Sequence, residues 1–165
     1  MTHDHIIDLF MQNAAAADAE PMRVKSEDLF TFLLAHLLES EGPIYCPRIT
    51  EIEKQLTLPA DRLVEDYALA SVCVKEVFGG IAETGSLVSL SSRGKPVQAG
   101  LLPPHHIALL AAKNIHKSLD GFFSLWGSGL PTNLTLETGP SRTADIELTL
   151  TVGVHGPERL TIIVF

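Results

Sequence analysis

The sequence predicts an α/β protein in which a layered sheet is flanked by helices, and three observations support this fold class. Apolar residues recur at helical spacing in the N-terminal third of the chain. Short runs that are typical of strands follow from about residue 70 onward. Helical segments join some of these runs, which favours a layered α/β sheet over a sandwich or a helix bundle.

Two helices are predicted in a short N-terminal part. Residues 6–19 carry apolar side chains at helical spacing. We expect this helix to be loosely attached and available to a partner chain, for example in a homodimer. A second helix is predicted to begin at Ser26, a favourable N-cap before two acidic residues, and to end near Gly42. Residues 1–25 are assigned to an N-terminal helix or arm, and residues 26–165 to one α/β domain.

Short elements are predicted along the rest of the chain. The predicted strands cover residues 44–46, 70–78, 86–90, 107–110, 133–137, 146–154 and 160–165. The predicted helices cover residues 49–56 and 115–126. Gly79 and Gly80 are expected to end the strand that precedes them, and residues 91–96 are expected to form a turn.

Composition excludes several classes of protein. The chain has 165 residues, is 45% hydrophobic and 19% charged, and carries a formal net charge of −8, so it is globular and suited neither to nucleic acid nor to an anionic membrane. Its two cysteines, Cys46 and Cys73, cannot provide a four-thiolate iron–sulfur site or a cysteine-rich zinc site. The sequence has neither a secretory segment nor a membrane-spanning stretch, so we expect a cytoplasmic protein with two free thiols.

Polar groups are concentrated in the segment 137–147, directly after a predicted strand. Gly139 permits a tight turn whose following amides can hold an anion. Hydroxyl, guanidinium and carboxylate groups follow it at Ser141, Arg142, Thr143 and Asp145. From residue types alone, a capped turn that is braced by the same side chains is favoured over a binding site.

Three histidines and a glycine-rich segment have less specific patterns. His155 lies in a loop between glycines, where an imidazole can act as a general acid or base or serve a structural role. His105 and His106 are neighbours on a predicted strand and point to opposite faces, so no shared metal site is expected. Residues 79–86 contain neither a Walker loop nor a dinucleotide fingerprint, but they present Glu83 and Thr84 at a turn.

Four segments in a fixed order resemble the LUD domain of the lactate utilisation protein C family. They are IAETGSL (81–87), LLPPHHI (101–107), GPSRTADIE (139–147) and GVHGP (153–157). The resemblance covers roughly residues 70–165, and residues 1–69 look shorter than the N-terminal part of typical members.

This resemblance implies a fold like that of the NagB, RpiA and CoA-transferase enzymes, and a role in the oxidation of L-lactate to pyruvate. The other components of that system carry iron–sulfur clusters, and no cofactor is identified for this chain. We expect an accessory or small-anion-binding protein whose pocket lies at the loop end of the sheet, where open α/β sheets bind ligands. Alternatives are a transferase or isomerase of the same superfold, with Glu83 as nucleophile or base, and a structural interaction subunit.

In this hypothesis the motif residues divide into two groups. Glu83, Asp145 and His155 are the candidate catalytic residues, and Asp145 and His155 handle protons. The candidate ligand-binding residues are Thr84, Gly139, Ser141, Arg142 and Thr143, among which Arg142 and the amides after Gly139 hold an anionic group.

Overall fold

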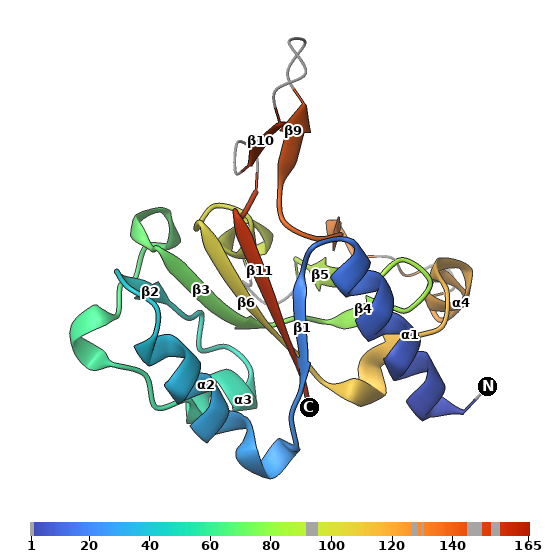
Figure 1. Ribbon diagram of the computed structural model, residues 1–165, viewed down its shortest axis with the longest axis horizontal. Helices are drawn as coiled ribbons and strands as arrows, with labels where there is room; N and C mark the ends of the chain where they lie inside the picture. The colour runs from blue at the N-terminus through green and yellow to red at the C-terminus, as the bar shows by residue number, and fades with distance from the viewer. Residues whose placement is uncertain (1, 92–95, 127–128, 130, 145–149, 153–155) are drawn as a thin grey trace.

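The computed structural model describes residues 2–91, 96–126, 129, 131–144, 150–152 and 156–165. A five-stranded sheet with strand order β1-β11-β6-β3-β2 forms its centre (Figure 1). These strands are β1 (Glu20–Arg23), β2 (Ile44–Tyr45), β3 (Val72–Glu76), β6 (His105–Leu110) and β11 (Arg159–Val164). Every pairing within this sheet is parallel. All residues of β6 are buried, as expected for a central parallel strand that is covered on both faces.

A second sheet of four strands lies beside the first, in the order β7-β4-β5-β8. Its strands are β4 (Gly79–Ile81), β5 (Ser86–Leu90), β7 (Ile115–His116) and β8 (Leu134–Glu137). The chain passes from one sheet to the other within two residues. The amide of Val77 donates to Leu109 of the first sheet, and the amide of Phe78 donates to Val88 of the second. The two sheets therefore meet at the carboxyl end of β3.

The helices lie on both faces of the central sheet. The α-helices are α1 (His3–Ala16), α2 (Leu29–Leu38), α3 (Glu51–Gln55) and α4 (Leu119–Ser124). Short 3-10 helices cover Ser26–Asp28, Ala60–Arg62, Tyr67–Leu69, Val97–Gly100 (η4) and Ala112–Asn114 (η5). A two-stranded hairpin of β9 (Arg142–Ala144) and β10 (Leu150–Val152) extends beyond the amino ends of β6 and β11 (Figure 1).

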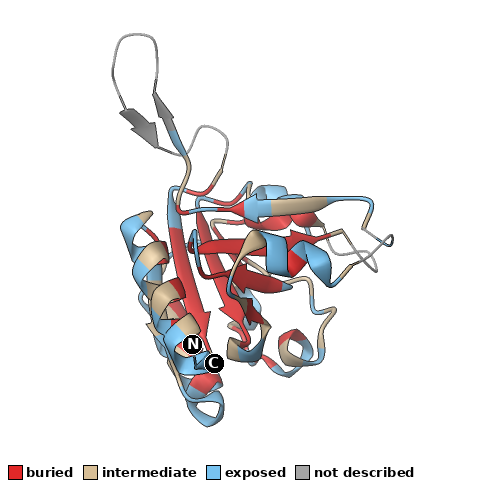
Figure 2. Cartoon of the chain, turned by 90° about the vertical axis from the view of Figure 1, so that its right-hand side faces the viewer, coloured by how far each residue is buried: buried red, intermediate tan, exposed pale blue. Residues whose placement is uncertain are grey.

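Two hydrophobic clusters cover the two faces of the central sheet. Alternate residues of β6 and β11 point to opposite faces, so each strand contributes to both clusters. One cluster contains Ile7, Phe10 and Ala14 of α1, and the other contains Leu29, Leu33 and Leu37 of α2. Figure 2 shows the buried strands in red between helices whose outer surfaces are exposed. The predicted α/β fold class, a layered sheet with flanking helices, is confirmed.

The N-terminal helix differs from its prediction in its role. α1 lies within the predicted range, but Phe10 and Ala14 are fully buried in the core of their own chain. The expectation of a loosely attached helix is therefore wrong. The strand β1, which follows α1, was not predicted, because Glu20–Arg23 contains a proline and little apolar character. A proline is compatible with this edge position.

Three further local predictions are corrected by the structure. Ser26 lies in a 3-10 helix and does not cap the following α-helix, whose N-cap is Asp28. Gly79 and Gly80 do not end the sheet structure but form β4, since Gly80 lets the strand approach the ring of Phe10. In the predicted helix 115–126 only Leu119–Ser124 is an α-helix, because Ile115–His116 pairs as β7.

In the part of the chain that the structure describes, no helix is both long and apolar enough to cross a bilayer.

Candidate functional site

The segments that carry the sequence motifs meet at the amino ends of β1, β6 and β11. The amide of Arg159, at the start of β11, donates to the carbonyl of Pro104, just before β6 (3.0 Å). The amide of Ser141 donates to the carbonyl of Pro157, just before β11 (2.8 Å). We call this region the amino edge. It is opposite the carboxyl edge, where open α/β sheets usually bind ligands, so the position expected for these segments is wrong.

The last turn of α1 is the centre of the amino edge. The side-chain amide of Asn13 donates to the carbonyls of Ala82 (2.8 Å) and Glu83 (3.2 Å). Gly85 and Gly139 have φ values of 69° and 74°, and both turns pack directly on the α1 backbone. A Cβ at position 139 would overlap the carbonyl oxygen of Ala17, the residue that ends α1. Both positions therefore require glycine, and α1 holds two motif turns together.

A chain of hydroxyl groups joins these two turns. The hydroxyls of Thr84 and Ser86 lie 2.7 Å apart, and those of Ser86 and Thr138 lie 2.6 Å apart. The pairing of β5 with β8 sets this geometry, because Leu87 lies opposite Glu137 in the register. Two motifs that are about 55 residues apart in the sequence thus share one hydrogen-bonded cluster.

Glu83 interacts with the start of a helix. Its Oε1 atom accepts a hydrogen bond of 2.6 Å from the amide of Leu119, the first residue of α4. A carboxylate at this position is favourable because the first amides of a helix have no partner within the helix. This hydrogen bond engages the carboxylate that would be the nucleophile or base of a transferase.

Arg142 and Asp18 form an ion pair at the surface of the amino edge. Nη2 of Arg142 contacts Oδ2 of Asp18, and the side chains are 53% and 49% exposed. Asp18 follows α1 with φ of 62°, a conformation that Asp tolerates better than most residues. Thr143 lies in β9. Asp145 and His155 lie outside the described residues.

A buried hydrogen-bonded pair connects the central sheet with the second sheet. Nδ1 of His106 lies 3.1 Å and 2.9 Å from the two carboxylate oxygens of Glu137, and both side chains are buried. The ring of His105 points to the opposite face, where its Nε2 lies 2.9 Å from the hydroxyl of Thr161. Among the described residues, no group of three His, Cys, Asp or Glu side chains is arranged to hold a metal ion.

Comparisons with known proteins identify the family. The LUD domain family matches residues 50–165, which is more than half of the chain. The chain belongs to the LUD domain family. The match begins after α1, so the helix at the centre of the amino edge precedes the matched residues.

The chain is also similar to individual proteins. An uncharacterised protein of Neisseria meningitidis serogroup B is 43% identical over 88 residues, covering 51% of this chain and 37% of that protein. Lactate utilization protein C of Halalkalibacterium halodurans is 34% identical over 110 residues, covering 63% of this chain and 48% of its own length. The Bacillus licheniformis protein of the same name is 28% identical, covering 95% of this chain and 67% of its own length. This LUD domain thus spans less than half the length of the first two relatives.

The fold is shared with a crystal structure of a DUF162 family protein from Deinococcus radiodurans. The TM-score is 0.73 at 20% identity, and the likeness covers 99% of this chain and 98% of that one. This likeness shows the fold, and it includes α1 and β1.

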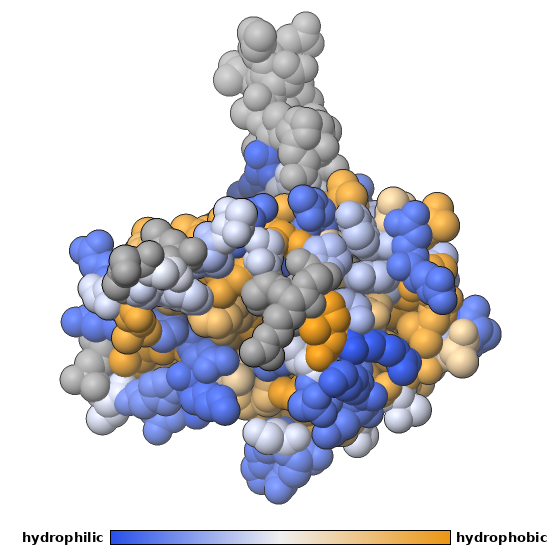
Figure 3. Space-filling view, turned by 180° about the vertical axis from the view of Figure 1, so that it is seen from behind, coloured by the Kyte–Doolittle hydropathy of each residue, from blue (hydrophilic) through white to orange (hydrophobic). Residues whose placement is uncertain are grey.

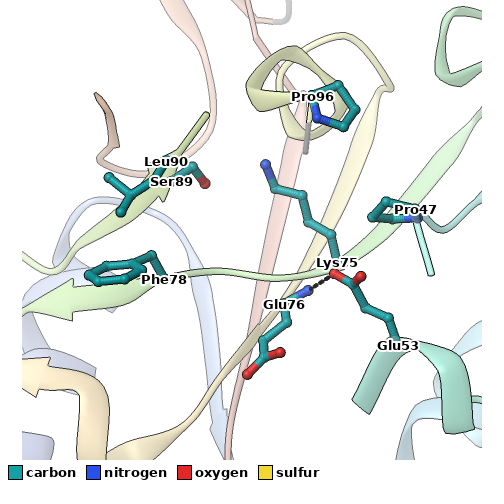
Figure 4. A pocket seen from close by; sticks show the side chains of 8 residues that line it. All are labelled: Pro47, Glu53, Lys75, Glu76, Phe78, Ser89, Leu90 and Pro96. Carbon is teal, nitrogen blue, oxygen red and sulfur yellow. Dashed lines mark hydrogen bonds between the residues drawn. The ribbon is translucent and has the colours of Figure 1, made fainter. Parts of the chain in front are cut away.

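Sequence reasoning missed two buried charged residues of the LUD domain that line a small pocket (Figure 4). Nζ of Lys75 donates to the carbonyl of Val97 (3.3 Å). The carboxylate of Glu53 is fully buried and accepts from the amides of Ile49, Thr50 and Glu76. The pocket measures only about 40 Å³, enough for a very small ligand or water. A lysine within an apolar strand was the one sequence signal for this site.

The two cysteines are free, as expected. Burial raises the pKa of Cys46 to about 11, and burial also raises the pKa of Cys73. Neither thiol is activated as a nucleophile at neutral pH.

Replacement of Gly139 tests the contact between α1 and the third motif. We expect Gly139→Ala to lower the free energy of unfolding by about 2 kcal/mol or more, because it adds left-handed strain and a clash. Urea unfolding followed by circular dichroism measures the change. Gly129→Ala is the control, since its Cβ would lie 3.7 Å from the nearest atom. Equal effects of the two substitutions would show that the contact is absent.

The pH dependence of stability tests the environment of His105. Burial, followed by the nearby Arg159 guanidinium, lowers the pKa of His105 to about 4. Between its ordinary pKa of about 6.5 and pH 4, the unfolded chain therefore binds a proton that the folded chain does not. The free energy of unfolding should fall by up to about 3 kcal/mol as the pH decreases through this window, and His105 should contribute nothing above it.

Urea titrations at several pH values measure this effect. His105→Gln should flatten the decrease, whereas His5→Gln, at an exposed position, should leave it unchanged. The same slope in both variants would contradict the assignment to His105.

Proposed function

We propose that this LUD domain is an accessory protein in the oxidation of L-lactate to pyruvate and that it binds a small carboxylate at the amino edge. Relatives named lactate utilization protein C support the process. The exposed ion pair between Arg142 and Asp18 supports a carboxylate as the ligand, since the guanidinium of Arg142 already binds the carboxylate of Asp18.

Exchange of Asp18 for a ligand carboxylate is energetically accessible. Both side chains are about half exposed, and ion pairs of this kind contribute only about 0–1 kcal/mol. A guanidinium binds any carboxylate through the same parallel hydrogen bonds, so lactate or pyruvate can replace the aspartate. Ser141 directly precedes Arg142 in the sequence, and in this proposal its hydroxyl bonds the hydroxyl or carbonyl group of the ligand.

The remaining roles follow from the family motifs. In this proposal Thr84 and Gly139 shape the edge of the binding site, and Thr143 extends it along β9. Asp145 and His155 accept or return protons if the ligand reacts here. Glu83 supports the site through α4, because its carboxylate is bound to Leu119.

Electrons need a separate carrier. Oxidation of lactate to pyruvate releases two electrons and two protons, and the two cysteines of this chain cannot hold a four-thiolate cluster. We therefore place this chain beside iron–sulfur partners that carry the electrons.

Calorimetric titration with L-lactate and pyruvate tests the proposal. Arg142→Ala should weaken binding at least about tenfold, which corresponds to the loss of one charge-assisted hydrogen bond. Asp18→Asn should strengthen binding, because it removes the competing carboxylate while Asn tolerates the same backbone conformation. Arg23→Ala, which breaks a comparable exposed pair with Asp4, is the matched control and should have no effect.

Opposite effects of Arg142→Ala and Asp18→Asn on affinity distinguish a ligand-binding role of the ion pair from a purely structural role in the turn. If Arg142 only braces the turn, Arg142→Ala and Asp18→Asn will both lower stability and leave affinity unchanged. That result, or no heat of binding for either acid at millimolar concentration, would overturn the proposal.

A further inference from the structure

A second cavity lies away from the amino edge and is independent of the function proposed above. It has a volume of about 470 Å³, within the range of small-molecule sites. We call it the aromatic pocket. Its lining residues are Glu76, Val77, Phe78, Asn114, His116, Phe122, Leu125 and Trp126.

The aromatic pocket lies at the carboxyl edge of the central sheet. Glu76 is the last residue of β3, and Asn114 ends η5, the turn that follows β6. The chain leaves β3 there and enters the second sheet, so the pocket lies where the two sheets meet. Open α/β sheets generally bind ligands in a crevice at this edge.

Aromatic rings form one wall of the pocket. The ring centroids of Phe78 and Trp126 lie 5.4 Å apart, and that of Phe122 lies 6.1 Å from each. Phe122 is fully buried, whereas Phe78 is 42% exposed. Figure 3 shows hydrophobic side chains reaching the surface on the side where α4 lies. The exposed part of Phe78 can stack against a planar ligand.

Polar groups lie beside the aromatic wall. Glu76 lines the pocket together with Asn114 and His116. Its carboxylate points away from the ammonium group of Lys75 (Figure 4). Burial lowers the pKa of His116, so its imidazole is neutral at pH 7 and offers one donor and one acceptor. Gly79 leaves space at this point, because a Cβ there would lie 2.8 Å from the carbonyl oxygen of Asn114.

The charge of the pocket restricts its ligand. Its described lining residues include one carboxylate and no lysine or arginine, so an anionic group is disfavoured. A ligand that stacks on the rings and donates hydrogen bonds to a carboxylate fits this chemistry. An amide and a neutral imidazole can each donate to a ring nitrogen of such a ligand.

We propose that the aromatic pocket binds a planar nitrogen heterocycle with an exocyclic amino group, such as an aminopurine. The amino group donates to Glu76, a ring nitrogen accepts from Asn114 or His116, and the ring stacks on Phe78 and Trp126.

Trp126 provides a direct readout, because it is the single tryptophan of the chain. Titration with adenosine should quench its fluorescence saturably, and a calorimetric titration should give the same affinity. Inosine, which has a carbonyl in place of the amino group, should bind at least about tenfold more weakly.

Two variants test the role of the carboxylate. Glu76→Gln should weaken adenosine binding about tenfold, since it removes a charged acceptor. Glu51→Gln makes the same change of charge at an exposed position of α3 and should have no effect. Urea unfolding shows whether the variants are folded, and Phe78→Leu, which removes one stacking face, provides a second test by calorimetry.

The adenosine titrations give different results if the proposal is right and if it is wrong. Saturable quenching that is weaker with inosine and with Glu76→Gln supports the proposal. No saturable response to millimolar adenosine, equal binding of inosine, or equal affinities of Glu76→Gln and Glu51→Gln would overturn it.

Discussion

The structure depends on the close approach of the last turn of α1 to two glycine turns. Gly85 and Gly139 both have positive φ and leave no space for a side chain against the helix backbone. Asn13 adds hydrogen bonds from the helix to the carbonyl groups beside the first turn. The contact gives two motif segments, which are about 55 residues apart in the sequence, a common support on one helix.

The two edges of the central sheet carry different chemistry. The amino edge has hydroxyl groups, an exposed guanidinium and tight turns, which suit a small carboxylate. The carboxyl edge has aromatic rings and a carboxylate, which suit a larger planar ligand. The buried pair of His106 and Glu137 joins the central sheet to the second sheet near the amino edge. The second sheet therefore contributes residues to both edges.

The sequence predicted those strands whose apolar pattern lies within the strand itself. The apolar runs of β6 and β11 and the strand β5 were predicted because their periodicity does not depend on distant residues. β1 and β4 were missed, since one contains a proline and the other two glycines, and each is a strand only through its partners. The motifs likewise indicated candidate residues but did not show at which edge of the sheet these residues lie, because that depends on how distant strands pair. Lys75 and the aromatic pocket were missed because no short motif marks them.

Hydrogen exchange at the end of α1 tests most directly whether this turn is an integral part of the fold. The amides of Ala17 and Ala19 donate to Asn13 and Ala14, at the point where both glycine turns pack. If the turn is integral, these amides exchange only through global unfolding, with the same free energy of opening as the amides of β6. Fast exchange of both amides while β6 remains protected would contradict the central role of this helix.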